Sequence, residues 1–236
     1  MKIKRPIIAL DFPNAETTQK FLSLFPKDEK LFVKIGMELY YSEGQAMVQS
    51  IIDQGHDVFL DLKCHDIPHT VENAMRVIGK LGVALTTVHA SGGSTMMRAA
   101  KEGLLDGSGG KTQAKILAIT QLTSTDEAMV ENEQLLRVDL PTSVKNYAKL
   151  AQKSGMDGVI CSAQEAKMIA ETTGPDFLRV TPGIRLKGNS KGDQKRVMTP
   201  DQAAKQQSSG LVVGRAITQA EDPVAAYRTV TKLWEG

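Results

Sequence analysis

Short apolar runs alternate with amphipathic segments along the sequence, and this alternation constrains the fold more than any other feature. Eight runs are short and rich in aliphatic or β-branched residues, which is typical of buried β-strands. They span residues 7–11, 31–36, 57–63, 84–90, 114–120, 158–162, 177–183 and 210–214. Strands that alternate with helical segments predict an α/β fold with a parallel sheet.

Helix signals lie between these runs. Pro68, Pro200 and Pro223 suit the first turn of a helix, where the missing N–H has no intrahelical partner. Two capping-box spacings also predict helix starts; they are Ser42 with Gln45 and Ser162 with Glu165. Each run is therefore followed by a segment that can form a covering helix.

Eight βα units in 236 residues favour a closed (β/α)₈ barrel, the TIM barrel. The runs are apolar enough to be buried on both faces, as strands between a filled barrel and a layer of helices are. An open, doubly wound sheet is the alternative. The longest gap, residues 121–157, predicts a short extra helix before the main helix of its unit. Because no linker is evident, we expect one catalytic domain over residues 1–236.

The charge balance and the cysteines exclude several classes of protein. There are 29 Lys and Arg against 27 Asp and Glu, so the overall charge of +2 favours neither nucleic acid nor a membrane surface as a partner. Cys64 and Cys161 have no metal-binding or redox spacing around them. The segment MKIKRPIIALDF lacks the apolar core of a signal peptide, and no stretch approaches the roughly 18 apolar residues of a membrane span. We expect a cytoplasmic protein.

Charged and polar residues gather where the predicted strands end, which is where (β/α)₈ barrels hold their active sites. Asp61 and Lys63 are two residues apart, so their side chains leave the same face of a strand, and Lys34 lies near the end of the neighbouring run. Buried charges are costly unless they are paired, so the cluster predicts a mutually neutralising network or, alternatively, a purely structural one. The complete set is Asp11, Lys34, Asp61, Lys63, Asp66, His89, Thr123, Arg185 and Arg215.

These charges favour proton transfer over other chemistries. A lysine that forms a Schiff base must be neutral, whereas two nearby carboxylates hold Lys63 as an ammonium and make it a proton donor. Two ammonium groups would repel a divalent cation, so we predict no metal, and no motif indicates an electron-sink cofactor. His65 and His69 have the spacing of a zinc helix, but Pro68 lies between them at a predicted helix start.

The loops after the last two predicted strands favour a phosphate site, because such barrels often bind phosphate there. Gly214 permits close approach of the backbone, and the guanidinium groups of Arg185 and Arg215 suit phosphate oxygens. The polar stretch around Gly188 and Gly192 suits a lid over the site. Its basic residues fit a solvated loop face better than direct contacts; they are Lys187, Lys191, Lys195 and Arg196.

The segment DLKCHDIPHT at 61–70 matches Asp-x-Lys-x-x-Asp-Ile-Pro-x-Thr, a signature of the orotidine 5′-phosphate decarboxylase family. ALDF, FVKIG, TPGIR and VVGRAI occur in the order that the same family has. The sequence therefore resembles this family over essentially its whole length. No position of the motifs departs from the family pattern.

The resemblance implies a homodimeric (β/α)₈ enzyme that converts orotidine 5′-phosphate to UMP and CO₂ without a cofactor, the last step of de novo UMP synthesis. It implies that Lys63 protonates C6 and that Asp61 lies near the departing carboxylate. Asp66 and Thr70 would reach the neighbouring subunit's site. The other implied contacts are Asp11 and Lys34 at the ribose, Thr123 at the pyrimidine, and Pro182, Arg185, Gln194, Gly214 and Arg215 at the phosphate side.

Three other hypotheses remain. Relatives of the 3-keto-gulonate phosphate and hexulose phosphate type share the Asp-x-Lys-x-x-Asp pattern, but they use magnesium and carry Glu where this chain has Lys34. A catalytically silent barrel would bind a nucleotide or a partner only. A generic phosphate-binding isomerase would account for Arg215 but not for the charges between residues 61 and 66.

Overall fold

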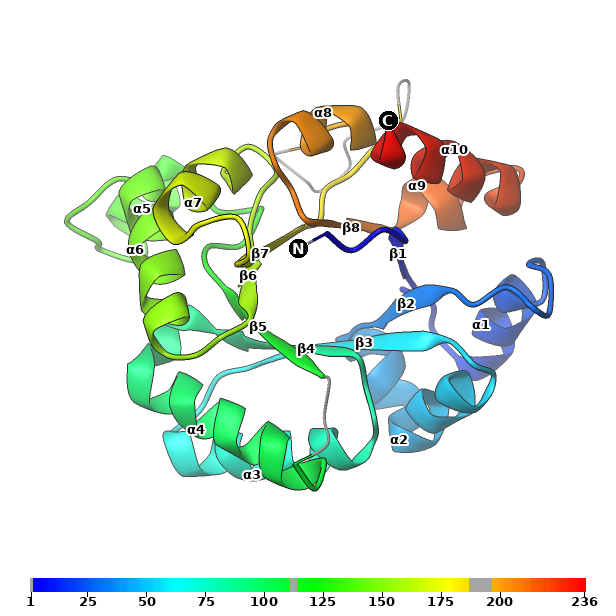
Figure 1. The fold of residues 1–236 in the computed structure, drawn as a ribbon, viewed down its shortest axis with the longest axis horizontal. Coiled ribbons are helices and arrows are strands. Elements are labelled where there is room, and N and C mark those ends of the chain that lie inside the picture. Colours follow the sequence, from blue (N-terminus) through cyan, green and yellow to red (C-terminus); the bar gives the residue numbers. More distant parts are fainter. Residues whose placement is uncertain (1, 111–113, 187–196) are drawn as a thin grey trace.

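The computed structural model describes residues 2–110, 114–186 and 197–236, which form a closed parallel barrel of eight strands surrounded by helices (Figure 1). Neighbouring strands pair in chain order, and pairing of the first strand with the last closes the ring. The strands are β1 (Ile7–Ala9), β2 (Phe32–Ile35), β3 (Asp57–Cys64), β4 (Leu85–His89), β5 (Lys115–Ile119), β6 (Gly158–Ile160), β7 (Leu178–Thr181) and β8 (Gly210–Val213). The closed ring confirms the predicted (β/α)₈ barrel and excludes an open sheet.

Helices follow the strands along the chain and cover the outside of the barrel (Figure 1). Pro68, Pro200 and Pro223 each occupy a first turn, as predicted. The gap between β5 and β6 holds two helices, the first of them short, which confirms the predicted extra helix. The helices are α1 (Ala15–Leu22), α2 (Met37–Asp53), α3 (Pro68–Lys80), α4 (Gly93–Gly107), α5 (Glu127–Asn132), α6 (Leu140–Lys153), α7 (Ala166–Thr173), α8 (Pro200–Lys205), α9 (Arg215–Thr218) and α10 (Pro223–Glu235), with a 3₁₀ turn at Ala90–Gly92.

The two capping-box predictions fare differently. The helix start predicted at Ser42 is wrong, because α2 begins at Met37 and is kinked at Gly44, where φ is +67°. A glycine tolerates this positive φ without strain, and its non-helical backbone separates α2 into two helical segments. At the second site the Glu165 carboxylate accepts a 2.8 Å hydrogen bond from the Ser162 N–H, but α7 begins only at Ala166. That pair therefore closes a turn ahead of the helix.

The apolar core has two layers. Side chains that point into the barrel form one cluster, which includes Ile7, Phe32, Phe59, Ile119 and Val212. The larger cluster lies between the strands and the helices. Filling the barrel interior leaves room for polar side chains only toward its two ends.

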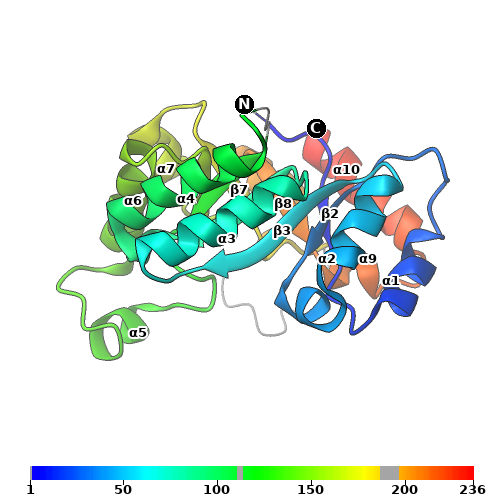
Figure 2. The same cartoon turned by 90° about the horizontal axis from the view of Figure 1, so that it is seen from below.

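Figure 2 views the barrel from the side and separates these ends. Both termini lie on one side, whereas α5, which follows the carboxyl end of β5, lies on the opposite side. The side that carries α5 is therefore the carboxyl end of the barrel. Among the helices in the described part of the chain, none is long and apolar enough to cross a membrane.

Candidate active site

Four charged side chains form a row of ion pairs toward the carboxyl ends of β1, β2 and β3. Lys63 Nζ donates a hydrogen bond to Asp61 Oδ2 at 2.8 Å. Lys34 Nζ donates to Asp11 Oδ1 at 3.0 Å and lies 4.0 Å from Asp61 Oδ2. The Lys34 and Asp61 side chains are only 11% and 10% exposed, so pairing offsets the cost of removing their charges from water. The structure thus brings together the acids and lysines that the sequence singled out at these strands.

The backbone at Lys63 is unusual. Its φ is +52°, a left-handed conformation that costs a residue with a Cβ about 1–3 kcal/mol. The pairing of β3 with β4 shifts register between Leu60 and Cys64, so the strand bulges where Lys63 stands. The bulge directs the lysine back toward Asp61.

Thr87, on the adjacent strand β4, connects the two halves of this bulge. Its hydroxyl donates to Asp61 Oδ1 at 2.8 Å and accepts a 3.1 Å hydrogen bond from the Lys63 backbone N–H. The side chain is fully buried. Thr87 was not among the predicted site residues, because threonine is an ordinary strand residue and nothing in the run ALTTVHA distinguishes it.

A pocket of about 270 Å³ opens beside this charge row. Its floor is apolar and comes from the barrel interior, whereas its wall includes Lys34, Asp61 and Lys63. Thr123 and Pro182, both predicted as substrate contacts, lie in the lining. The remaining lining residues are Phe59, Ile119, Gln121, Leu122, Ser124, Ile160 and Val212.

Gln121 is a second residue of the site that was not predicted from the sequence. Its side-chain nitrogen donates to Gln134 Oε1 at 2.9 Å and to Ser143 Oγ at 3.0 Å, so it ties the wall of the pocket to the segment that contains α5 and α6. Its position two residues past β5, at the carboxyl end of the barrel, is the signal that was available.

The predicted phosphate contacts follow β7 and β8. Arg185 is buried, and its Nη1 donates to the backbone carbonyl of Ile184 at 2.9 Å. Arg215 is exposed and begins α9 directly after Gly214. A Cβ at Gly214 would lie 3.7 Å from Asp11 Oδ2, so this glycine is adjacent to the charge row. Gln194 and the basic residues Lys187, Lys191, Lys195 and Arg196 lie outside the described residues.

The residues predicted to serve a neighbouring subunit are exposed in the single chain. Asp66 accepts a 2.6 Å hydrogen bond from the Ile67 N–H just before α3, and Thr70 lies in the first turn of that helix. Neither contributes to the lining of the pocket in its own chain. Between them Ile67 is 66% exposed.

Two histidines and a cysteine lie beside Lys63. The rings of His65 and His89 stack with their centroids 5.5 Å apart. Burial, together with the nearby His65 and Lys63, lowers the pKa of His89. Burial raises the pKa of the Cys64 thiol, which disfavours the thiolate that a nucleophile requires. Within the described ranges, no three His, Cys, Asp or Glu side chains are grouped as metal ligands.

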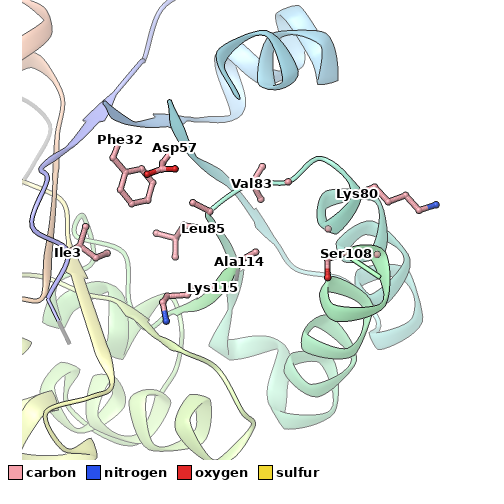
Figure 3. Close-up of a pocket in the computed structure, with 13 residues that line it drawn as sticks. Ile3, Phe32, Asp57, Lys80, Val83, Leu85, Ser108, Ala114 and Lys115 are labelled. Carbon is pink, nitrogen blue, oxygen red and sulfur yellow. The ribbon is translucent and has the colours of Figure 1, made fainter. Parts of the chain in front are cut away.

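A larger cavity, of about 690 Å³, lies at the amino end of the barrel (Figure 3). Figure 3 shows Ile3, Phe32 and Leu85 directed toward its centre and Lys80 directed away. Its acid, Asp57, is already paired with Arg5 and Lys30. Because barrel active sites lie at the opposite end, the smaller pocket of about 270 Å³ beside Lys63 is the better candidate for the active site.

Comparison with protein families gives a match over residues 4–230 to the family described as "Orotidine 5′-phosphate decarboxylase / HUMPS family". A protein named orotidine 5′-phosphate decarboxylase from Ligilactobacillus salivarius is 70% identical over 234 residues, which is 99% of each chain. One of the same name from Enterococcus faecalis is 56% identical over 231 residues, 98% of each chain.

Solved structures agree with the sequence comparisons. The crystal structure of orotidine 5′-phosphate decarboxylase from Lactobacillus acidophilus superimposes with a TM-score of 0.89 at 45% identity. The match covers 98% of this chain and 99% of that one. The similarity therefore extends over the whole barrel.

Proposed function

The chain belongs to the orotidine 5′-phosphate decarboxylase / HUMPS family, and on this basis we propose that it decarboxylates orotidine 5′-phosphate to UMP and CO₂ without a cofactor. Lys63 is the proton donor in this proposal. The observation that carries it is the 2.8 Å contact of Lys63 Nζ with Asp61 Oδ2 at the wall of an otherwise apolar-floored pocket.

The reaction demands electrostatic stabilisation. When the bond between C6 and the carboxylate breaks, CO₂ leaves and the electron pair stays on C6 in an orbital that the ring does not fully delocalise. The Lys63 ammonium then transfers a proton to C6 and becomes a neutral amine, which solvent reprotonates. A fixed ammonium interacts more strongly with the developing carbanion than with the ground state, and this difference raises the rate.

Asp61 has two roles in this mechanism. Its carboxylate accepts a hydrogen bond from the Lys63 side chain and holds Nζ in place. It also lies near the departing carboxylate, so that repulsion in the ground state is relieved as CO₂ leaves. Since Asp61 Oδ2 already accepts from Lys63 and lies 4.0 Å from Lys34 Nζ, two cations occupy the space that a divalent metal would need.

The other side chains bind the parts of the substrate that do not react. Asp11 and Lys34 bind the ribose, and Thr123 contacts the pyrimidine edge. Binding energy from the remote phosphate contributes to closing and ordering the site. The phosphate side comprises Pro182, Arg185, Gln194, Gly214 and Arg215.

The active form is a homodimer in which Asp66 and Thr70 complete the neighbouring subunit's site. Their exposure in the single chain, on either side of the exposed Ile67, supports this arrangement. Mixing an inactive Asp66→Ala variant with an inactive Lys63→Ala variant is expected to restore part of the activity through hybrid sites. Failure of complementation, with subunit exchange verified, contradicts a shared site.

Residues 1–236 act as one catalytic domain in this proposal, and the location is the cytoplasm. In the described part of the chain, Cys64 and Cys161 form no disulfide, which is compatible with a reducing compartment. The substrate is orotidine 5′-phosphate and the product is UMP, with neither nucleic acid nor membrane as a partner.

Loss of the absorbance of orotidine 5′-phosphate, measured after treatment with a chelator, tests the proposed function. Full activity is expected after chelation. Activity that required Mg²⁺ would instead favour the magnesium-dependent members of the wider family. No turnover by a folded protein that binds UMP would favour a catalytically silent barrel.

A further inference from the structure

We infer that Thr87 is a positioning residue for the decarboxylation, which holds Asp61 and the backbone of Lys63 in register. The inference rests on the proposed function. Thr87 does not itself line the pocket, but both of its hydrogen-bond partners, Asp61 and Lys63, do, so it acts through them.

The direction of both hydrogen bonds is fixed by chemistry. A threonine hydroxyl has one proton to donate and lone pairs that accept. The Lys63 backbone N–H can only donate, so the hydroxyl accepts from it at 3.1 Å. Its own proton therefore goes to Asp61 Oδ1 at 2.8 Å, where an ionised carboxylate makes the bond strong.

This bond orients the Asp61 carboxylate. One oxygen, Oδ1, accepts from Thr87, and the other, Oδ2, accepts from Lys63 Nζ. With both oxygens engaged, the carboxyl group has little freedom to rotate, and the position of the ammonium follows from the position of Oδ2. Without the hydrogen bond at Oδ1, the Asp61 carboxylate can rotate, and the position of Lys63 Nζ is then less well fixed.

The second bond supports the strained part of the strand. The register of β3 against β4 shifts between Leu60 and Cys64, and Lys63 sits within the shift at φ +52°. The hydroxyl of Thr87 accepts the Lys63 N–H at this point. Thr87 itself lies in a regular part of β4, paired with Leu117 of β5, so its Cα is firmly placed. The β-branched side chain adds stiffness at χ1.

Thr86 provides a matched control. It precedes Thr87 on the same strand and is also fully buried. In the described part of the chain, however, its Oγ1 has no hydrogen-bond partner. The two threonines therefore differ in the contacts of their hydroxyls and not in burial.

The experiment compares Thr87→Val, Thr87→Ser and Thr86→Val in the full chain. For each variant, kcat and KM for orotidine 5′-phosphate, the affinity for UMP and the melting temperature are measured. Thr87→Val is expected to lower kcat by about 10- to 100-fold, the size of effect that small misplacement of a reacting group produces. KM and UMP affinity should change little, because Thr87 does not line the pocket. Thr87→Ser keeps the hydroxyl and should recover most of the lost kcat.

Thr86→Val should keep wild-type kcat, since its hydroxyl bonds to nothing in the described structure. If Thr87→Val does not fold, Thr87→Cys replaces it in the experiment. The same loss of kcat is expected for Thr87→Cys, because a thiol is a weak donor. If the wild type is active and Thr87→Val and Thr86→Val have equal kcat, the inference about Thr87 is wrong but the proposed function still holds. A loss of UMP affinity in proportion to kcat would also overturn the inference. A wild type that does not decarboxylate orotidine 5′-phosphate would overturn the proposed function and the inference with it.

Discussion

Strand β3 carries an acid between two cations at each of its ends. At the amino end, Asp57 pairs with Arg5 and with Lys30, whose side chains are 38% and 59% exposed. At the carboxyl end, Asp61 pairs with Lys63 and lies near Lys34, whose side chains are 27% and 11% exposed. Asp57 and Asp61 therefore stand four residues apart on one strand, each beside two cations, but the cations around Asp61 are less exposed to solvent.

The difference shows that burial, and not charge composition, decides what such a cluster can do. Exposed cations are screened by water and move with their long side chains, so their field at any one point is weak. The cations around Asp61 are held by carboxylates beside a pocket with an apolar floor, where a fixed charge acts strongly on a reacting atom. The amino-end cluster links β3 to Arg5 and Lys30, whereas the carboxyl-end cluster is the one that we propose for catalysis.

The largest expected effect comes from removing one lysine from each cluster. Lys63→Ala should retain its fold and its affinity for UMP but lose decarboxylation by several orders of magnitude, because general acid catalysis alone contributes about 10²- to 10⁴-fold. Lys30→Ala should keep full activity. Rates measured from the absorbance of orotidine 5′-phosphate make the comparison, and a Lys63→Ala variant with near wild-type turnover contradicts the assigned proton donor.

Replacing the aspartate of each cluster, Asp61 or Asp57, by asparagine is expected to give the next largest difference in kcat. Asp61→Asn should lower kcat by about 10²- to 10³-fold, since Lys63 loses the carboxylate that holds its Nζ in place. Asp57→Asn should leave kcat unchanged. Steady-state kinetics of the two variants side by side are sufficient, and a loss of activity in Asp57→Asn would show that the two ends of β3 are coupled.

The pH dependence of the free energy of unfolding tests the contribution of Asp57 at the amino end of β3. Burial pushes the pKa of Asp57 upward, but hydrogen bonds from Arg5 and Lys30 outweigh it and hold the pKa below its ordinary value. The stability from this acid is therefore fully present above the unfolded pKa of about 3.9 and is lost as the pH falls through the lower folded value. Asp57→Asn should cost about 1 kcal/mol at neutral pH and less in acid. Denaturant titrations of both proteins at pH 7 and pH 3 measure this, and an equal loss at both values contradicts it.

The smallest expected effect concerns the most exposed cation. Lys30→Ala should reduce the free energy of unfolding by no more than about 0.5 kcal/mol, because exposed ion pairs are weak. Added salt should remove even this difference. Chemical denaturation at low and high ionic strength tests it, and a larger loss that persists in salt would mean that Lys30 contributes by packing.

Much of this architecture follows from patterns that are local in the sequence. Each predicted strand is present to within a residue or two at its ends, because a buried parallel strand must be continuously apolar. The acid and lysine of β3 could be placed together because their spacing is that of one strand face. The prediction at Ser42 failed because the first helical segment of α2 already begins at Met37 and the break falls two residues after Ser42, at Gly44.

The parts that escaped prediction depend on partners distant in sequence. Thr87 contacts Asp61 and Lys63 only because of the register of β4 against the bulge in β3. A hydrophobic pattern does not predict such a bulge. Gln121 likewise depends on where Gln134 and Ser143 lie after the insertion folds. Long-range register is set by packing across the barrel, so no single segment encodes it.

The left-handed backbone at Lys63 has an evolutionary consequence. Glycine or asparagine would occupy that conformation with less backbone strain, but would leave Asp61 without its 2.8 Å ion pair and would remove the proton donor that we propose. A library screened for survival of heat and a library screened for turnover would therefore weigh position 63 differently: the first measures backbone strain against the ion pair, and the second measures the proposed proton donor as well.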